Sequence, residues 1–166
     1  MAKKMLRLVG LALLALGAFL VWYRWNYSMK KAVGFEMRPS GRAGDVLIAT
    51  QGSAYKDSVV SCLVRDLADM DVHVRVMDIS GLASADTASW DAIVLLHTWE
   101  YYEPQLDAAD FAVRHPGLSK LVVLTTSGSG GERLDTVDGI SSASVIADAQ
   151  ADETILLKRV KELLPR

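Results

Sequence analysis

The chain of 166 residues has a formal net charge of −2, and this small value conceals two oppositely charged parts. Residues 1–42 contain eight basic side chains and one acidic one, whereas residues 43–166 contain ten basic and nineteen acidic ones. The acidic part is long enough for one compact domain, and its charge argues against binding to the phosphates of nucleic acid.

The first predicted element is an apolar helix near the N-terminus. The residues from Leu8 to Tyr23 include no charged side chain, and Arg7 and Arg24 border them. A helix needs about 20 residues to cross the apolar core of a bilayer, and bordering arginines extend the span by reaching toward the headgroups. Aromatic side chains gather at its C-terminal end, as in an interfacial belt: Trp22, Tyr23, Trp25 and Tyr27. The pattern predicts a single transmembrane helix within residues 1–25, with membrane lipid as its partner.

A cleaved secretory signal is the alternative interpretation of this segment. Residues 3–7 would form its basic region, and Leu16-Gly17-Ala18 offers a small-residue cleavage site. Residues 19–23 stay bulky and apolar beyond that site, which favours an uncleaved anchor. The only cysteine, Cys62, lies far from the segment and offers neither a lipid-attachment site there nor an internal disulfide.

Residues 26–44 form the predicted linker, because they lack an apolar period and end in a Pro/Gly/Ser-rich stretch from Pro39 to Gly44. Five basic side chains lie between the helix and the domain, and three precede the helix. This distribution favours a single-pass membrane protein whose C-terminal domain faces the cytoplasm. The three basic residues before the helix reduce the difference in positive charge between its two ends, on which this orientation depends. The basic linker also suits anionic lipid headgroups.

Strand-like and helix-like segments alternate through residues 45–166, the predicted domain. Continuous apolar runs indicate buried strands, alternation of valine with polar residues indicates a half-exposed strand, and apolar residues at helical spacing indicate helices. Strands are expected at residues 46–49, 72–76, 92–96, 121–124 and 143–147. Helices are expected at residues 59–67, 106–113 and from near Asp152 onward, with a shortened polar crossover at 79–90.

This order of elements predicts an α/β fold with a doubly wound, parallel, five-stranded sheet, preceded by the transmembrane helix. The alternating strand at 72–76 suits an edge of the sheet, and the continuous apolar runs suit its centre. A strand order of 2-1-3-4-5 accounts for both observations, because it places the second strand at an edge. Ligands of such folds bind beyond the carboxyl ends of the strands, where the first and third strands separate.

Three loops follow the first, third and fourth predicted strands and are therefore expected to meet at that place. They span residues 50–58, 97–104 and 125–132. In the first loop, Ser53-Ala54-Tyr55-Lys56-Asp57-Ser58 resembles the Ser-x-Tyr-Gly-x-Thr segment of the flavodoxin-like family, with lysine in place of glycine. The stretch Trp90-Asp91-Ala92-Ile93-Val94 resembles the entry to the third strand of that family, Tyr-Asp-x-Ile-Val. The resemblance extends over roughly residues 45–164.

The resemblance implies non-covalent binding of FMN and electron transfer to a redox protein partner at the membrane. The FMN phosphate would lie among hydroxyls and backbone amides at a helix N-terminus, and aromatic rings would flank the isoalloxazine. The cofactor-binding residues implied in this way are Ser53, Tyr55 and Ser58 for the phosphate, and Thr98, Trp99, Tyr101, Ser127 and Gly128 for the ring. No catalytic acid or base is implied, because the flavin would supply the redox chemistry.

A second hypothesis keeps the fold without the cofactor, as a membrane-tethered interaction module with an acidic surface. Lys56 and Asp57 in the first loop and the shortened crossover favour it. Ser, Thr and Gly after strands are also ordinary turn and cap residues, and the aromatic loop could equally cover the sheet end or rest on the membrane surface. His73, His97 and His115 are separated and lack partners at metal-ligand spacing, so no metal site is predicted.

Overall fold

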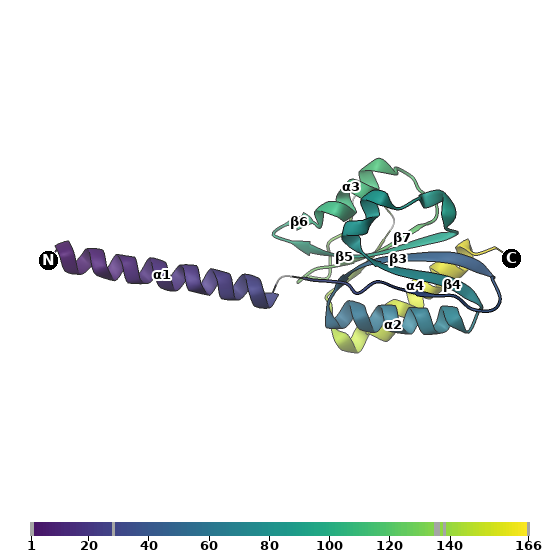
Figure 1. Ribbon diagram of the computed structural model, residues 1–166, viewed down its shortest axis with the longest axis horizontal. Coiled ribbons are helices and arrows are strands. Elements are labelled where there is room, and N and C mark those ends of the chain that lie inside the picture. The colour runs from purple at the N-terminus through teal and green to yellow at the C-terminus, as the bar shows by residue number, and fades with distance from the viewer. Residues whose placement is uncertain (1, 28, 135–136, 138, 166) are drawn as a thin grey trace.

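The computed structural model describes residues 2–27, 29–134, 137 and 139–165, without the side chains of residues 2 and 24–27. The predicted belt residues Trp25 and Tyr27 thus have side chains outside the described part. Figure 1 shows a long helix, α1 (Ala2–Tyr27), that projects from a domain in which helices cover both faces of one sheet.

The described residues form an eight-stranded sheet in which five neighbouring strands are parallel. Across the sheet, the parallel strands are β4 (Val72–Asp78), β3 (Gly44–Gly52), β5 (Ala92–Glu100), β7 (Leu121–Thr126) and β8 (Gly139–Ser142). The predicted α/β fold with a mostly parallel sheet is confirmed. Counted along the chain, these five strands lie in the order 2-1-3-4-5, and three short additional strands enlarge the sheet beyond the predicted five.

Two of the additional strands lie in the segment that was expected to be a linker. β1 (Lys30–Lys31) pairs antiparallel with the end of β3, and β2 (Phe35–Met37) pairs antiparallel with β4 and forms the sheet edge. Between them, the Ala32 backbone N–H donates to Asp78 Oδ2 at 2.8 Å. The pairing satisfies backbone groups that an open edge would leave to solvent. This segment is therefore laid along the sheet.

Two apolar layers hold the helices against the sheet. On one face, α2 (Ala54–Ala68) and α4 (Ala149–Leu163) pack against each other. The other face is covered by α3 (Leu106–Arg114) and the 3-10 helix η1 (Ile79–Ser84), which is followed by a second 3-10 helix, η2 (Thr87–Ser89). The predicted shortening of the second crossover is confirmed. Alternate residues of β3, β5 and β7 enter the two layers, because successive strand residues point to opposite faces.

The expected last strand at residues 143–147 is wrong. The chain pairs with β7 earlier, through β8, and then forms a 3-10 helix, η3 (Ile146–Asp148), which leads into α4 at Ala149 rather than near Asp152. A Cβ on Gly139 would lie 3.1 Å from the Val123 carbonyl oxygen, so the small residues at this point allow a close approach to β7. The strand therefore forms at the small residues Gly139–Ser142, which fit closely against β7, and not at the apolar run of residues 143–147.

The helix α1 agrees in length and composition with a membrane span. Its segment Lys3–Tyr23 has 21 residues and a mean hydropathy of 2.2, and none of it is buried inside the protein. At about 1.5 Å per residue, such a segment is about 30 Å long, the thickness of the apolar core of a bilayer. Among the described residues it is the one helix with these properties, and a signal sequence near an N-terminus would share them.

Candidate functional site

The candidate site lies at the carboxyl edge of the sheet, where β3 and β5 continue toward helices on opposite faces. Two grooves open there, and Met29 lines both. The first, of about 780 Å³, lies between residues 29–33 and the start of α2, beside Ser53. The second, of about 500 Å³, lies between the loops that follow β5 and β7. It brings together the five residues predicted for the flavin ring: Thr98, Trp99, Tyr101, Ser127 and Gly128.

The predicted phosphate residues Ser53 and Ser58 both bond within α2 and its cap. Ser53 is the N-cap of the helix, and its side-chain oxygen accepts the backbone N–H of Lys56 at 3.2 Å. Ser58 donates its hydroxyl to the Ala54 carbonyl oxygen at 2.9 Å, one helical turn earlier. Ser53 lines the first groove, whereas Ser58 lines neither groove. The local sequence therefore builds a well-capped helix start.

Tyr55, the third predicted phosphate residue, points into the core. Its hydroxyl lies 3.0 Å from Ser142 Oγ and also contacts Asp152 Oδ2, to which Ser142 donates at 2.7 Å. Burial raises the pKa of Tyr55 well above its ordinary value, and the hydrogen bond to the Asp152 carboxylate acts in the same direction. Tyr55 thus connects α2 with β8 and α4, which is a structural role.

Lys56 stands where the flavodoxin-like segment has glycine, and its side chain fills the place where β3 and β5 separate. It is 1% exposed, and it lines neither groove. Its Nζ donates to Thr98 Oγ1 and lies 3.8 Å from Met29 Sδ. Burial lowers the pKa of Lys56 to about 8, against a smaller opposing effect of the Glu100 carboxylate. The protein therefore encloses this ammonium group beneath Met29.

A chain of hydrogen bonds runs from Lys56 across the ends of three strands. Thr98 Oγ1 lies 3.1 Å from Thr126 Oγ1, and Thr126 donates to the His97 carbonyl oxygen at 3.2 Å. Because Thr126 uses its hydrogen there, Thr98 must donate to Thr126 and accept from Lys56. The Thr98 backbone N–H is satisfied by Gln51 Oε1 at 2.7 Å. The hydroxyls of Thr98 and Thr126 and the ammonium group of Lys56 thus bond to one another in a continuous chain.

His97 is buried beside this network. Its Nε2 lies 2.9 Å from Thr125 Oγ1, and its Nδ1 has no hydrogen-bond partner among the described groups. Burial lowers the pKa of His97 to about 4, so the imidazole is neutral near pH 7. The ring lines neither groove, which removes it from contact with any ligand bound there.

The aromatic loop after β5 is a hairpin that extends beyond the sheet. β5 turns back into β6 (Glu103–Pro104), and Tyr101 and Tyr102 form the two-residue turn with φ values of 53° and 65°. Two positive φ angles match a type I′ turn, where asparagine and glycine are preferred and tyrosine is strained. The two tyrosines are 81% and 97% exposed, whereas Trp99 packs against the core at the base of the hairpin.

The loop after β7 uses most of its polar groups internally. Ser127 Oγ accepts the Gly130 backbone N–H at 3.0 Å, and the Ser127 N–H donates to the Ser142 carbonyl oxygen at 3.1 Å. Gly128 is exposed, and a Cβ placed there would meet no atom within 4 Å. Gly128 therefore leaves open space beside the second groove, whereas the Ser127 hydroxyl is engaged within its own loop.

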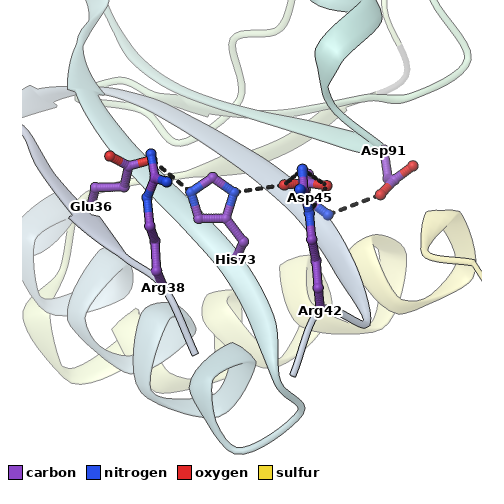
Figure 2. Close-up of polar contacts among 6 residues, drawn as sticks. All are labelled: Glu36, Arg38, Arg42, Asp45, His73 and Asp91. Atoms are coloured by element: carbon purple, nitrogen blue, oxygen red, sulfur yellow. Dashed lines mark hydrogen bonds and ion pairs between the residues drawn. The ribbon is translucent and has the colours of Figure 1, made fainter. Parts of the chain in front are cut away.

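At the opposite, amino edge of the sheet, His73 lies between two carboxylates (Figure 2). Its Nδ1 lies 2.6 Å from Asp45 Oδ1, and its Nε2 lies 2.7 Å from Glu36 Oε1. Each ring nitrogen thus lies within hydrogen-bond distance of a different carboxylate. Arg42 also donates to Asp45, at 2.8 Å and 3.0 Å.

These contacts join β2, β3 and β4, because each strand supplies one of the three central groups. The hydrogen bond from His73 lowers the pKa of Glu36. At Asp45, burial acts to raise the pKa, but hydrogen bonds from His73 and Arg42 outweigh it, and the pKa is lowered. The parallel register places His73 directly opposite Asp45, a pairing that becomes visible once the strand order is known. Nothing in the described residues groups three or more His, Cys, Asp or Glu side chains as a metal site.

FMN, the cofactor that the resemblance implies, does not fit the phosphate half of the candidate site. The side chains expected to bind phosphate cap the helix, enter the core or bond to the helix backbone. The backbone of β1 lies against the same loop, since a Cβ on Gly52 would be 3.0 Å from the carbonyl oxygens of Lys30 and Lys31. Asp57 also places an acidic group in the first turn of α2, where a phosphate would need positive potential. The ring half of the site remains open as the second groove.

Comparison with known proteins agrees with the architecture. Flavodoxin 2 from Bacillus cereus is similar in structure, with a TM-score of 0.52, 15% sequence identity, and coverage of 71% of this chain and 98% of the flavodoxin. A flavodoxin from the domain Archaea is similar at a TM-score of 0.50 and 12% identity, over 72% of this chain and 98% of the other. No family model and no curated protein matches the sequence. The likeness in structure establishes that the domain has the flavodoxin-like fold.

Proposed function

We propose that this chain is a membrane-anchored flavodoxin-fold module that acts by binding a protein partner, without FMN. The observation that carries the proposal is Lys56, whose buried ammonium group occupies the point where β3 and β5 separate. An ammonium group could attract a phosphate, but this one donates to Thr98 beneath Met29 and lines neither groove. The ammonium group is therefore used in a hydrogen bond inside the fold and is not presented to a ligand in either groove.

The membrane anchor is the second part of the proposal. The length and hydropathy of the Lys3–Tyr23 segment, none of which is buried in the domain, support insertion into a bilayer, because an apolar surface of that size is costly in water. The excess of basic residues after the helix supports a cytoplasmic position for the domain. In that position, the nineteen acidic groups of residues 43–166 would favour a partner with a basic surface.

A flavin-dependent electron carrier is the second candidate, favoured by the second groove. The five residues predicted for the flavin ring meet there, and Trp99 and Tyr101 supply aromatic surface of the kind that stacks on an isoalloxazine ring. Non-covalent FMN would supply the electron chemistry for a redox protein partner at the membrane. This candidate requires a phosphate position other than the one implied by Ser53, Tyr55 and Ser58.

An FMN titration of the full chain in detergent micelles separates the two candidates. We expect the absorbance spectrum and the fluorescence of FMN to stay unchanged when an equimolar amount of protein is added, and the purified protein to be colourless. The Trp99→Leu variant serves as a matched control, because it removes ring stacking but keeps the apolar contact at the base of the hairpin. Saturable quenching of flavin fluorescence by the wild-type chain, lost in Trp99→Leu, would refute the cofactor-free proposal.

A further inference from the structure

The hairpin tip formed by Tyr101 and Tyr102 combines two unusual properties. Its side chains are 81% and 97% exposed, although tyrosine carries a large apolar ring. Its backbone holds both residues at positive φ, a conformation that costs a non-glycine residue free energy. Burial of these rings in the fold does not offset that cost. The tip therefore has the form of a contact surface whose partner lies outside the domain.

The direction of the chain at β1 shows what lies in front of this tip. β1 is antiparallel to β3, and Lys30 pairs with Gly52 at the carboxyl end of β3. Moving back along the chain from Lys30, the backbone thus leaves the domain at the carboxyl edge, on the side toward which the β5–β6 hairpin points. Figure 1 shows this arrangement, with α1 and the hairpin on the same side of the domain.

The reach of the hairpin matches the length of the connection to α1. The register of β3 and β5 pairs Thr50 with Leu96 and so places Gly52 level with Thr98, three residues before Tyr101. Three strand residues rise about 10 Å. From Lys30 back to Tyr27, the end of α1, the chain also has three steps, which span at most about 11 Å. The hairpin tip therefore rises about as far above the sheet edge as the chain allows the end of the helix to lie, and Tyr23 of α1 lines the second groove together with both tyrosines.

We infer that the Tyr101–Tyr102 hairpin tip is a second membrane contact, which places its two rings in the headgroup region of the bilayer that holds α1. This inference rests on the proposed membrane anchor. The interfacial region is about 5–8 Å deep on each side of the apolar core, a depth that suits a ring with one polar end. With α1 and the hairpin both in contact, the carboxyl edge and its second groove face the bilayer surface.

The charges around the tip indicate which lipid it favours. Glu100 and Glu103 flank the two tyrosines in sequence, and Glu132 lines the adjacent groove. These carboxylates would be repelled by anionic headgroups, so the surface that fits the tip itself is zwitterionic, whereas Lys30 and Lys31 of β1, at the same sheet edge, would attract anionic headgroups. Phosphatidylcholine is therefore the bilayer in which we expect the contact to be strongest.

The test measures the environment of a dye at the tip in the full chain, reconstituted in phosphatidylcholine nanodiscs. Tyr102→Cys, in a Cys62→Ser background, carries an environment-sensitive fluorophore, and quenchers are attached to the lipid headgroups or acyl chains. We expect blue-shifted emission and several-fold stronger quenching by the lipid-borne quenchers than for the control Val113→Cys. Val113 is 72% exposed and lies in the last turn of α3, near the opposite edge of the sheet.

A third labelled variant separates failure of this inference from failure of the anchor. Leu14→Cys places the dye in the middle of α1, where acyl-chain quenchers must reach it if the helix spans the bilayer. Quenching at 14 without quenching at 102 overturns the hairpin contact and leaves the anchor standing. A blue shift at 102 without lipid quenching assigns the tip to a protein contact and also overturns it. Absence of quenching at both positions overturns the anchor and the hairpin contact together.

Discussion

Replacement of Lys56 by methionine is expected to stabilise the protein at neutral pH. The side chain is 1% exposed, so its ammonium group has lost most of its hydration. Burial lowers the pKa of Lys56 from 10.5 to about 8. The folded state therefore binds this proton more weakly than the unfolded state does, and the charge costs stability at any pH below about 8.

The magnitude follows from the size of the pKa change. One pKa unit corresponds to about 1.4 kcal/mol, so a decrease from 10.5 to about 8 represents about 3 kcal/mol. Methionine has a similar length and fills the same space, but it loses the hydrogen bond to Thr98, which offsets about 1 kcal/mol. We expect Lys56→Met to raise the free energy of unfolding by about 2 kcal/mol at pH 7.

Urea unfolding of the full chain in detergent micelles, followed by tryptophan fluorescence, measures this difference. Wild-type stability should rise between about pH 8 and pH 10.5, because only the unfolded state still holds the proton in that range, whereas Lys56→Met should lack that component. The control Lys158→Met, at an exposed position on α4, should unfold as the wild type does. A Lys56→Met chain less stable than the wild type at pH 7 would show that the buried charge stabilises the fold and would refute the reasoning.

Three further predictions concern other parts of the domain. Replacing the turn by Tyr101→Asn with Tyr102→Gly should raise the free energy of unfolding in urea by about 1–2 kcal/mol, because a type I′ turn prefers these residues; an unchanged or lower stability contradicts the strain. His73→Gln should raise the pKa of Glu36, measured by carboxyl NMR titration. Because the wild-type pKa is lowered, the contact stabilises the fold at neutral pH and is lost as the pH falls through that lowered value, so His73→Gln should flatten the acid limb of the unfolding profile. Tyr55→Phe should lower the free energy of unfolding by about 1 kcal/mol, because one hydrogen bond is lost. A changed response to FMN in this variant would instead indicate that Tyr55 takes part in ligand binding.

Much of the architecture could be predicted from the period of apolar residues, because burial on one or both faces of a strand leaves a local record in the sequence. The runs at 46–49, 92–96 and 121–124 lie in the centre of the sheet, and the alternating run at 72–76 lies near its edge. The two strands in the segment that was expected to be a linker leave no such pattern in the sequence. β1 and β2 have two and three residues, and backbone pairing with distant strands holds them in place.

The candidate site likewise has one part that could be predicted from the sequence and one that could not. The convergence of Trp99, Ser127 and Gly128 follows from strand order alone, since loops at the carboxyl ends of neighbouring strands must meet. The direction of each side chain in the first loop depends on helix phase: Tyr55 and Lys56 face the interior, and Ser58 bonds back to its own helix. A resemblance between short segments does not specify that phase, so the phosphate residues could not be assigned from sequence.

The pairing of β1 and β2 with the sheet has a consequence for partner selection. Sixteen residues lie between the end of α1 and the start of β3, and a fully extended chain of this length could span about 55 Å. With β1 paired, the sheet edge is held within about 11 Å of the helix end. On the proposed anchor, the domain would then explore a thin layer parallel to the bilayer rather than a hemisphere around its attachment point. Partners would be selected by the height of their binding surface above the lipid, and release of the two strands would convert a short-range contact into a long-range one.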